Sequence, residues 1–292
     1  MRNFKGMSKC LILFAVAALP ALLYAPLVSA TTLGSAQSFA VLGHESVTNA
    51  HQDDNPTTQV YGNLGVTPGT SVTGFYPDGT VTGGGIHIEP DSVAQNALAD
   101  AGTAYTTLSG YSGTDLTGQD LGGGRTITPG VYTMTDSVAY LNGALTLDAE
   151  GLSNALFVFN LAAALTTGSD AVVNVIRGDP STEVYWVIGS TATLGDDTVF
   201  AGNILAHTTV ILDPRAEILC GRAFALNGSV TLIDNFISNN NSLEDFGSGR
   251  SDFGSYGFSG GSGAPIPEPA SVSLLGLGIA VLIARRIRRR TV

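Results

Sequence analysis

The sequence predicts a mainly β protein, a β-solenoid of short stacked strands with one long α-helix packed alongside. Three observations predict this fold. Short apolar strands recur in matching register in the second half of the chain, glycines recur at matching corners, and one segment has helical periodicity. A β-sandwich also combines short strands with glycine-rich corners, so it remains the alternative from the pattern alone.

The strand repeat is clearest in residues 155–232, where four stretches each contain an apolar strand, a polar corner and a second strand. Thr193, Ile211 and Thr231 take equivalent positions, 18 and 20 residues apart. A third strand closes each turn, and Gly202 and Gly221 follow it where the chain must bend tightly. Three strands in a turn of about 18 residues describe a solenoid whose turns stack ~4.8 Å apart.

Residues 91–108 are the predicted helix, because their apolar side chains recur every three or four positions. Pro90 suits a first helical position and Gly110 suits a helix end. A helix of this length can cover one side of the solenoid. Its apolar stripe consists of Ala94, Leu98, Ala101, Tyr105 and Leu108.

Charge is unevenly distributed along the 292 residues, whose formal net charge is −11. The two basic ends leave five arginines against 24 acidic residues between them. This acidic body argues against a nucleic-acid partner, because phosphate binding needs a cationic surface. The four histidines lack metal-ligand spacing, so we expect no metal and no cofactor. Asp196 and Asp197 with Arg215 could imitate a lyase site, but adjacent acids at a corner are usually only solvated, and we expect no catalytic residues and no enzyme.

The N-terminal residues 1–30 have the basic start, apolar run and small-residue cleavage site of a signal peptide. We expect signal peptidase to remove them, while an uncleaved membrane anchor is the alternative. Cleavage leaves Cys220 as the one cysteine, which predicts a packed apolar side chain and no intramolecular disulfide. The folded body is then residues 31–238, and the Asn-, Ser- and Gly-rich residues 239–264 predict a flexible linker.

The C-terminal residues 265–292 contain Pro267, Glu268 and Pro269, followed by a short apolar run and an arginine cluster. The apolar run barely crosses a hydrocarbon core, which needs roughly 20 residues. This ending resembles the PEP-CTERM sorting signal of Gram-negative bacteria. The resemblance implies transient inner-membrane anchoring, removal of the tail by an exosortase, and delivery to the cell surface or extracellular matrix. An ordinary C-terminal membrane anchor is the alternative.

Outward positions on the second strand of each turn form an uncharged ladder of small, mostly β-branched residues. Their restricted χ1 angles make the ladder rigid, so it loses little entropy when it meets a regular surface. A methyl beside a hydroxyl can order water in a lattice-like layer, which predicts ice binding, although threonine is also common on ordinary solvated sheets. The candidate ice contacts are Thr166, Thr191, Thr193, Thr209, Ile211, Ser229 and Thr231. A second candidate face comprises Thr167, Ser169 and Thr198, beside charged residues that are costly to desolvate.

The body as a whole resembles the microbial ice-binding proteins built as a discontinuous β-solenoid. The matching stretches include residues 33–42, 62–69, 127–132, 192–195 and 202–206. The resemblance implies a right-handed triangular solenoid whose sequence and stacking orders differ, no enzyme activity, and adsorption to ice that slows its growth and recrystallisation. The alternative is a structural or adhesion protein of the cell surface or biofilm matrix, with exopolysaccharide as its partner and no ice activity.

Overall fold

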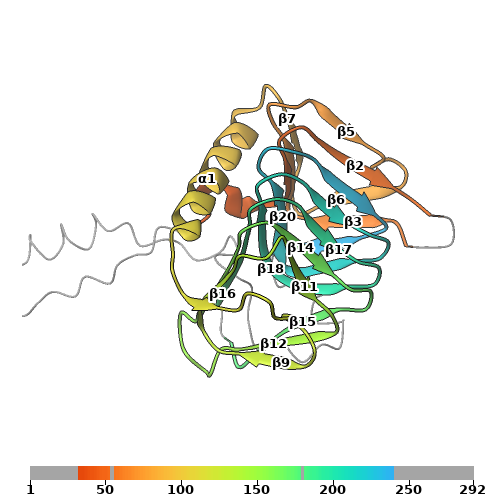
Figure 1. Ribbon diagram of the computed structural model, residues 1–292. Helices are drawn as coiled ribbons and strands as arrows, with labels where there is room; N and C mark the ends of the chain where they lie inside the picture. Colours follow the sequence, from red (N-terminus) through yellow and green to blue (C-terminus); the bar gives the residue numbers. More distant parts are fainter. Residues whose placement is uncertain (1–31, 53–55, 179–180, 240–292) are drawn as a thin grey trace, which may run out of the picture.

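The computed structural model describes residues 32–52, 56–178 and 181–239, which form a three-sided β-solenoid with one α-helix (Figure 1). This confirms the predicted fold class. The signal peptide, the sorting tail and all but the first residue of the predicted linker lie outside the described residues. Within the described part, no helix is both long and apolar enough to cross a membrane.

All strand pairs are parallel, and the strands form three faces that we name the helix face, the Thr face and the third face. In stacking order, the helix face contains β8 (Thr114–Asp115), β10 (Gly130–Met134), β13 (Leu156–Leu161), β16 (Glu183–Ile188), the second halves of β18 (Val199–Ala206) and β20 (Glu217–Ala225), β1 (Phe39–Gly43), β4 (Asn63–Val66) and β7 (Ile86–Ile88). The Thr face contains β11 (Val138–Leu141), β14 (Ala164–Thr167), β17 (Ala192–Leu194), β19 (Val210–Leu212), β21 (Val230–Ile233), β2 (Ser46–Ala50) and β5 (Ser71–Thr73). The third face contains β9 (Arg125–Ile127), β12 (Ala144–Asp148), β15 (Val172–Ile176), the first halves of β18 and β20, β22 (Phe236–Ser238), β3 (Thr58–Tyr61) and β6 (Gly79–Thr82).

The stacking order differs from the sequence order, as the family resemblance implied. On the Thr face, β2 from the start of the chain pairs with β21 from its end, with Thr48 opposite Thr231. On the helix face, β1 pairs in the same way with β20. The N-terminal turns therefore extend the stack beyond the C-terminal turns.

Strand alternation sends every second side chain into the solenoid, where a continuous apolar core fills the interior. Aromatic rings from successive turns stack within it. The ring centroids of Phe159 and Trp186 lie 4.1 Å apart, nearly parallel, and the Trp186 indole N–H donates to the carbonyl of Ala201 at 3.0 Å. These directional contacts fix the register between turns in addition to the ladder hydrogen bonds.

Helix α1 (Ser92–Ser109) lies along the helix face, at one side of the stack (Figure 1). Asp91 is its N-cap and accepts a hydrogen bond from the Val93 N–H at 2.7 Å, so Pro90 lies outside the helix and not at its predicted first position. The Asp91 carboxylate accepts a hydrogen bond from a backbone N–H group at the start of the helix, whereas the side chain of proline has no acceptor. The predicted stripe faces inward, joined by the buried Ala97 and Ala104.

Glycine is required at the corner between the third and helix faces, where Gly202 pairs with Gly221 of the next turn. Gly202 has φ of 106°, and a Cβ there would lie 2.7 Å from a methyl carbon of Val184. Cys220 is the extra residue of the bulge beside this pair; it is half-buried against the core and forms no disulfide within the described residues.

Candidate functional site

The Thr face aligns four residues of the predicted ladder into one row that crosses all seven of its strands. Backbone register places Thr166 opposite Thr193, Thr193 opposite Ile211, and Ile211 opposite Thr231. The row continues beyond the predicted residues at both ends. Its complete order is Tyr140, Thr166, Thr193, Ile211, Thr231, Thr48 and Thr73.

A second outward row runs parallel to the first, two residues earlier in each turn, on the strand or directly before it. It brings together the predicted Thr191, Thr209 and Ser229, and it adds Ser46 and Ser71. The Ser46 hydroxyl donates to the Ser229 hydroxyl at 2.8 Å, across two strands that are far apart in sequence. Toward the β11 end, Ala164 and Val138 complete this row without hydroxyl groups.

The rows rest on a fully buried layer of apolar side chains. Leu165, Ala192, Val210 and Val230 alternate with the outward residues, and their side chains have no exposed surface. The seven strands contain no charged residue. The face is therefore rigid and neutral, and a second surface can cover it without desolvating an ion.

The structure adds Ser46, Thr48, Ser71 and Thr73 to the predicted face. Each pair belongs to a Ser-Val-Thr triplet, and Ser229 and Thr231 belong to a third copy of this triplet. The shared triplet was a usable sequence signal. Only the discontinuous stacking, however, brings the N-terminal triplets beside the C-terminal one.

The second candidate face was wrong for two of its three residues. Thr167 is 3% exposed and Thr198 is fully buried, and their hydroxyls hydrogen bond to each other at 2.8 Å inside the corner. These hydroxyls bind successive turns to each other and cannot contact an external surface. Ser169 is exposed, but it lies alone on the corner turn after β14.

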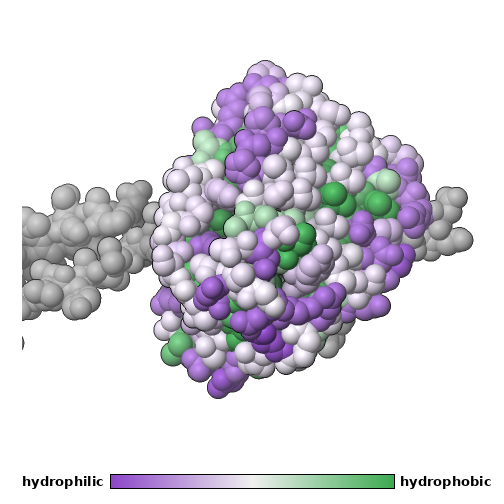
Figure 2. Space-filling model, viewed as in Figure 1, coloured by the Kyte–Doolittle hydropathy of each residue, from purple (hydrophilic) through white to green (hydrophobic). Residues whose placement is uncertain are grey.

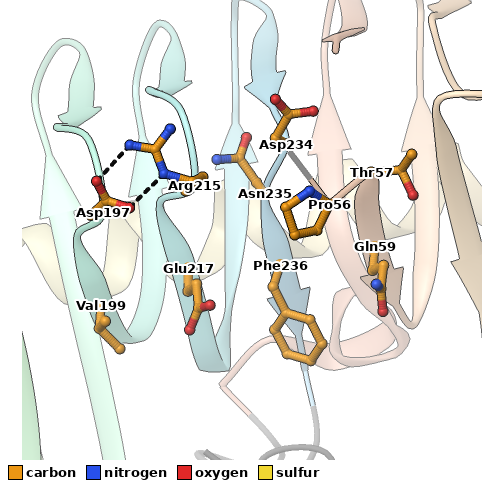
Figure 3. A pocket seen from close by; sticks show the side chains of 10 residues that line it. All are labelled: Pro56, Thr57, Gln59, Asp197, Val199, Arg215, Glu217, Asp234, Asn235 and Phe236. Carbon is orange, nitrogen blue, oxygen red and sulfur yellow. Dashed lines mark hydrogen bonds and ion pairs between the residues drawn. The ribbon is translucent and has the colours of Figure 1, made fainter. Parts of the chain in front are cut away.

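The corner between the Thr face and the third face contains an open pocket of about 410 Å³ (Figure 3). Asp197, Arg215 and Asp234 occupy equivalent corner positions with φ of 56°, 61° and 54°. The Arg215 guanidinium donates to both Asp197 oxygens, at 2.7 and 2.6 Å, and lowers the pKa of that carboxyl. Asp197 and Arg215, which could imitate part of a lyase site, therefore form an ion pair that joins two successive turns.

A further carboxylate at this corner is also held in structural contacts. The Asp234 carboxylate is 2.6 Å from His51 Nδ1 and accepts from the Gln52 backbone N–H at 2.9 Å. Burial and the nearby Asp196 raise the pKa of Asp213. Within residues 32–52, 56–178 and 181–239, no group of three or more His, Cys, Asp or Glu side chains could hold a metal ion.

At its β11 end, the Thr face borders a surface that is neither flat nor neutral. Tyr140 occupies the last position of the main row and is 51% exposed. Its ring borders a hollow of about 360 Å³ that Asp120, Asp136 and Asn142 also line. A large ring and two carboxylates interrupt the flat, neutral pattern at this end.

The surface on the side shown in Figure 2 is mostly of intermediate hydropathy, and its hydrophobic side chains form only small, separate groups. Five large apolar side chains are strongly exposed among the described residues, and only Tyr140 belongs to the Thr face. The Thr face therefore differs from an ordinary hydrophobic protein–protein interface, whose core is rich in large apolar side chains.

Comparison with known proteins gives two family matches. Residues 41–238 match the family described as ice-binding-like, and residues 265–290 match the PEP-CTERM protein-sorting motif. An ice-binding protein of Nostoc sp. (strain HG1) is 46% identical over 212 residues, which cover 72% of this chain and 75% of that protein.

Solved structures agree with these matches. The crystal structure of an ice-binding protein from the Antarctic ascomycete Antarctomyces psychrotrophicus has a TM-score of 0.65 at 34% identity, covering 73% of this chain and 99% of that chain. An ice-binding protein from an Antarctic biological consortium has a TM-score of 0.63 at 35% identity, covering 70% of this chain and 89% of that chain.

Proposed function

Because the chain belongs to the ice-binding-like family, we propose that it adsorbs to ice through the Thr face and so inhibits ice growth and recrystallisation. The family is non-enzymatic, and the sorting motif implies export to the surface of a Gram-negative cell. One observation carries the proposal: the strands that form the Thr face are uncharged and align two outward rows across the whole stack.

The spacing of the rows supports adsorption to a lattice. Neighbouring strands repeat every ~4.8 Å, which is near a repeat of ice, and the two rows lie about 6.7 Å apart along each strand. Most positions of the main row are threonines, which carry a hydroxyl and a methyl group together, so ordered water can be held by both hydrogen bonding and apolar contact. Seven strands span roughly 29 Å, and many weak contacts over this length add up.

Local rigidity favours the same role. Threonine and isoleucine are β-branched, and their χ1 angles are restricted before any contact is made. Each strand is paired on both sides except at the ends of the stack, so the backbone under the rows cannot rearrange freely. Little conformational entropy is lost on adsorption.

The test replaces Thr193 and Thr231 by tyrosine in one variant, and Thr146 and Thr80 by tyrosine in a matched control. All four residues point outward from strands, but the control pair lies on the third face. We expect the first variant to lose recrystallisation inhibition and the control to retain it, with unchanged far-UV circular dichroism in both. Unchanged inhibition in the first variant would refute this face.

A different outcome would support the alternative function of a structural or adhesion protein. In that outcome the wild-type chain binds exopolysaccharide but neither shapes ice crystals nor inhibits recrystallisation at any concentration. Exosortase processing and release into the matrix belong to the same proposal. They are tested by the mass of the chain recovered from cells and from the medium, because removal of the sorting tail shortens it.

A further inference from the structure

The hollow beside Tyr140, at the β11 end of the stack, is built by side chains and not by an open strand edge. Residues 116–123 run along the outer edge of β11. The Leu121 N–H donates to the Tyr140 carbonyl at 2.9 Å, and the Gly123 N–H donates to the Asn142 carbonyl at 2.7 Å. Because these carbonyls are already paired, a further strand cannot join β11 at this point, and what the hollow offers to a partner is its side chains.

Two carboxylates on the wall of the hollow are fixed by backbone donors. Asp120 accepts from the Gly122 N–H at 2.8 Å and from the Asn142 N–H at 3.0 Å, and the Asn142 side-chain amide donates to its second oxygen. Asp136 accepts from the Gly118 N–H at 2.7 Å through one oxygen. These contacts hold the charged groups in place before any ligand arrives, so little conformational entropy is lost when one binds.

Several polar groups of the hollow remain available for a ligand. Within the described part of the chain, the Tyr140 hydroxyl, the Gln119 side-chain amide and the Ser137 hydroxyl have no hydrogen-bond partner, and neither has the other oxygen of Asp136. The first three belong to exposed residues. Uncommitted donors and acceptors therefore share the hollow with the Tyr140 ring, which is 51% exposed.

An exposed ring beside hydroxyl, amide and carboxylate groups matches the chemistry of a sugar. A pyranose ring has apolar C–H faces and a rim of hydroxyl groups that both donate and accept. Its face can cover the Tyr140 ring and remove apolar surface from water, while its hydroxyls donate to Asp136 and exchange hydrogen bonds with Gln119. Hydrogen bonds to an ionised carboxylate are about twice as strong as those between neutral groups. From this arrangement we infer that the hollow binds one or two units of a polysaccharide chain.

The size and charge of the hollow narrow the ligand to a neutral sugar. Its volume of about 360 Å³ lies near the lower end of small-molecule sites, ~300–1,000 Å³, and suits one or two sugar rings. None of the described residues that line it is cationic, and Arg125 acts on Asp120 from outside the hollow. A uronate or sulfated sugar would bring a further negative charge beside Asp120 and Asp136 with no cation to pair with it. A neutral hexose is therefore the preferred unit.

This site is separate from ice adsorption. Tyr140 is the last member of the main row, so a sugar on its ring leaves the other six strands of the Thr face uncovered. One molecule can therefore hold a neutral polysaccharide while its Thr face stays free. The inference goes beyond the proposed function and does not depend on it.

The site is tested by isothermal titration calorimetry of the purified full chain with two neutral sugars, mannohexaose and cellohexaose. We expect the wild type to bind at least one of them, and Tyr140→Ala to lose at least about tenfold in affinity because it removes the ring. Tyr111→Ala is the matched control, since Tyr111 is 42% exposed and does not line the hollow, and it should bind like the wild type. Wild-type chain that binds neither sugar, or Tyr140→Ala with unchanged affinity, would overturn the site.

The preference for a neutral sugar is tested with the mannuronate hexasaccharide. It differs from mannohexaose only in carrying a carboxylate at the sixth carbon of each unit, and we expect it to bind at least about tenfold more weakly. Asp136→Asn should narrow that difference, because the amide keeps the shape of the side chain and removes its charge. Equal or tighter binding of the mannuronate by the wild type would overturn the assignment to a neutral sugar.

Recrystallisation assays on the same variants separate this inference from the proposed function. Tyr140→Ala should retain recrystallisation inhibition, and the variant with Thr193→Tyr and Thr231→Tyr should retain sugar binding. Sugar binding by a wild-type chain that has no ice activity would refute the proposed function alone. Ice activity without sugar binding would refute this inference alone.

Discussion

The layer under the Thr face can be tested with Leu212→Ala. Leu212 is fully buried in the middle of the stack, opposite Leu194 of β17. Its outward neighbour Ile211 is the central residue of the main row. Removing the side chain therefore creates a cavity directly beneath the proposed ice contacts.

The expected loss of stability follows from the buried volume. Leucine to alanine removes three carbons, which costs about 2.4 kcal/mol in transfer free energy, and the cavity brings the total to ~3 kcal/mol or more. For a folded body of this size, that corresponds to a melting temperature lower by roughly 6–12 °C. Differential scanning calorimetry measures it directly.

Leu147→Ala on the third face is the matched control, since Leu147 is equally buried. We expect both variants to lose similar stability, while only Leu212→Ala weakens recrystallisation inhibition, because only its cavity lies below the Thr face. The reasoning is refuted if Leu212→Ala melts within about 2 °C of the wild type. Equal loss of ice activity in the two variants would show that activity follows general stability and not the level of this face.

Three further predictions concern the end of the face, the helix and the corner. Tyr140→Thr should extend the flat row by one strand and raise thermal hysteresis; a fall would show that the ring itself contributes. Asp91→Ala should cost about 1 kcal/mol in denaturant unfolding by removing the cap on the Val93 N–H, without changing ice activity. Arg215 lowers the pKa of Asp197, so this pair adds stability that is present above the ordinary carboxyl pKa of about 4 and is lost as the pH falls through the lowered value. Arg215→Ala should therefore flatten the acid-side fall in melting temperature, and an unchanged profile would contradict it.

Some of the face was predictable because solenoid turns repeat in sequence. Thr193, Ile211 and Thr231 recur at nearly constant spacing, and that spacing alone placed them on one row. The partners Thr48 and Thr73 carry the same local Ser-Val-Thr signal. Their place in the row depends on a pairing between the two ends of the body, which no local periodicity encodes.

The buried corner threonines illustrate the limit of a two-residue alternation. Thr167 immediately follows the outward Thr166, so its side chain points inward, where it meets Thr198 from the next turn. The sequence places both threonines and the exposed Ser169 around one corner and the third strand of the turn, which suggested a shared face. Burial at a corner depends on how the chain bends there, and the bend is set by contacts with the turns above and below.

The sequence by itself predicted the solenoid, the helix beside it, the uncharged ladder and the sorting tail, because each of these is encoded in local periodicity or in a contiguous motif. Only the tertiary structure decided the order of the turns and the full extent of the Thr face. Those features depend on which distant strands pair. Pairing is decided by the summed packing of the whole core and by contacts such as those between Asn239 and Gln37, which join residues far apart in the chain.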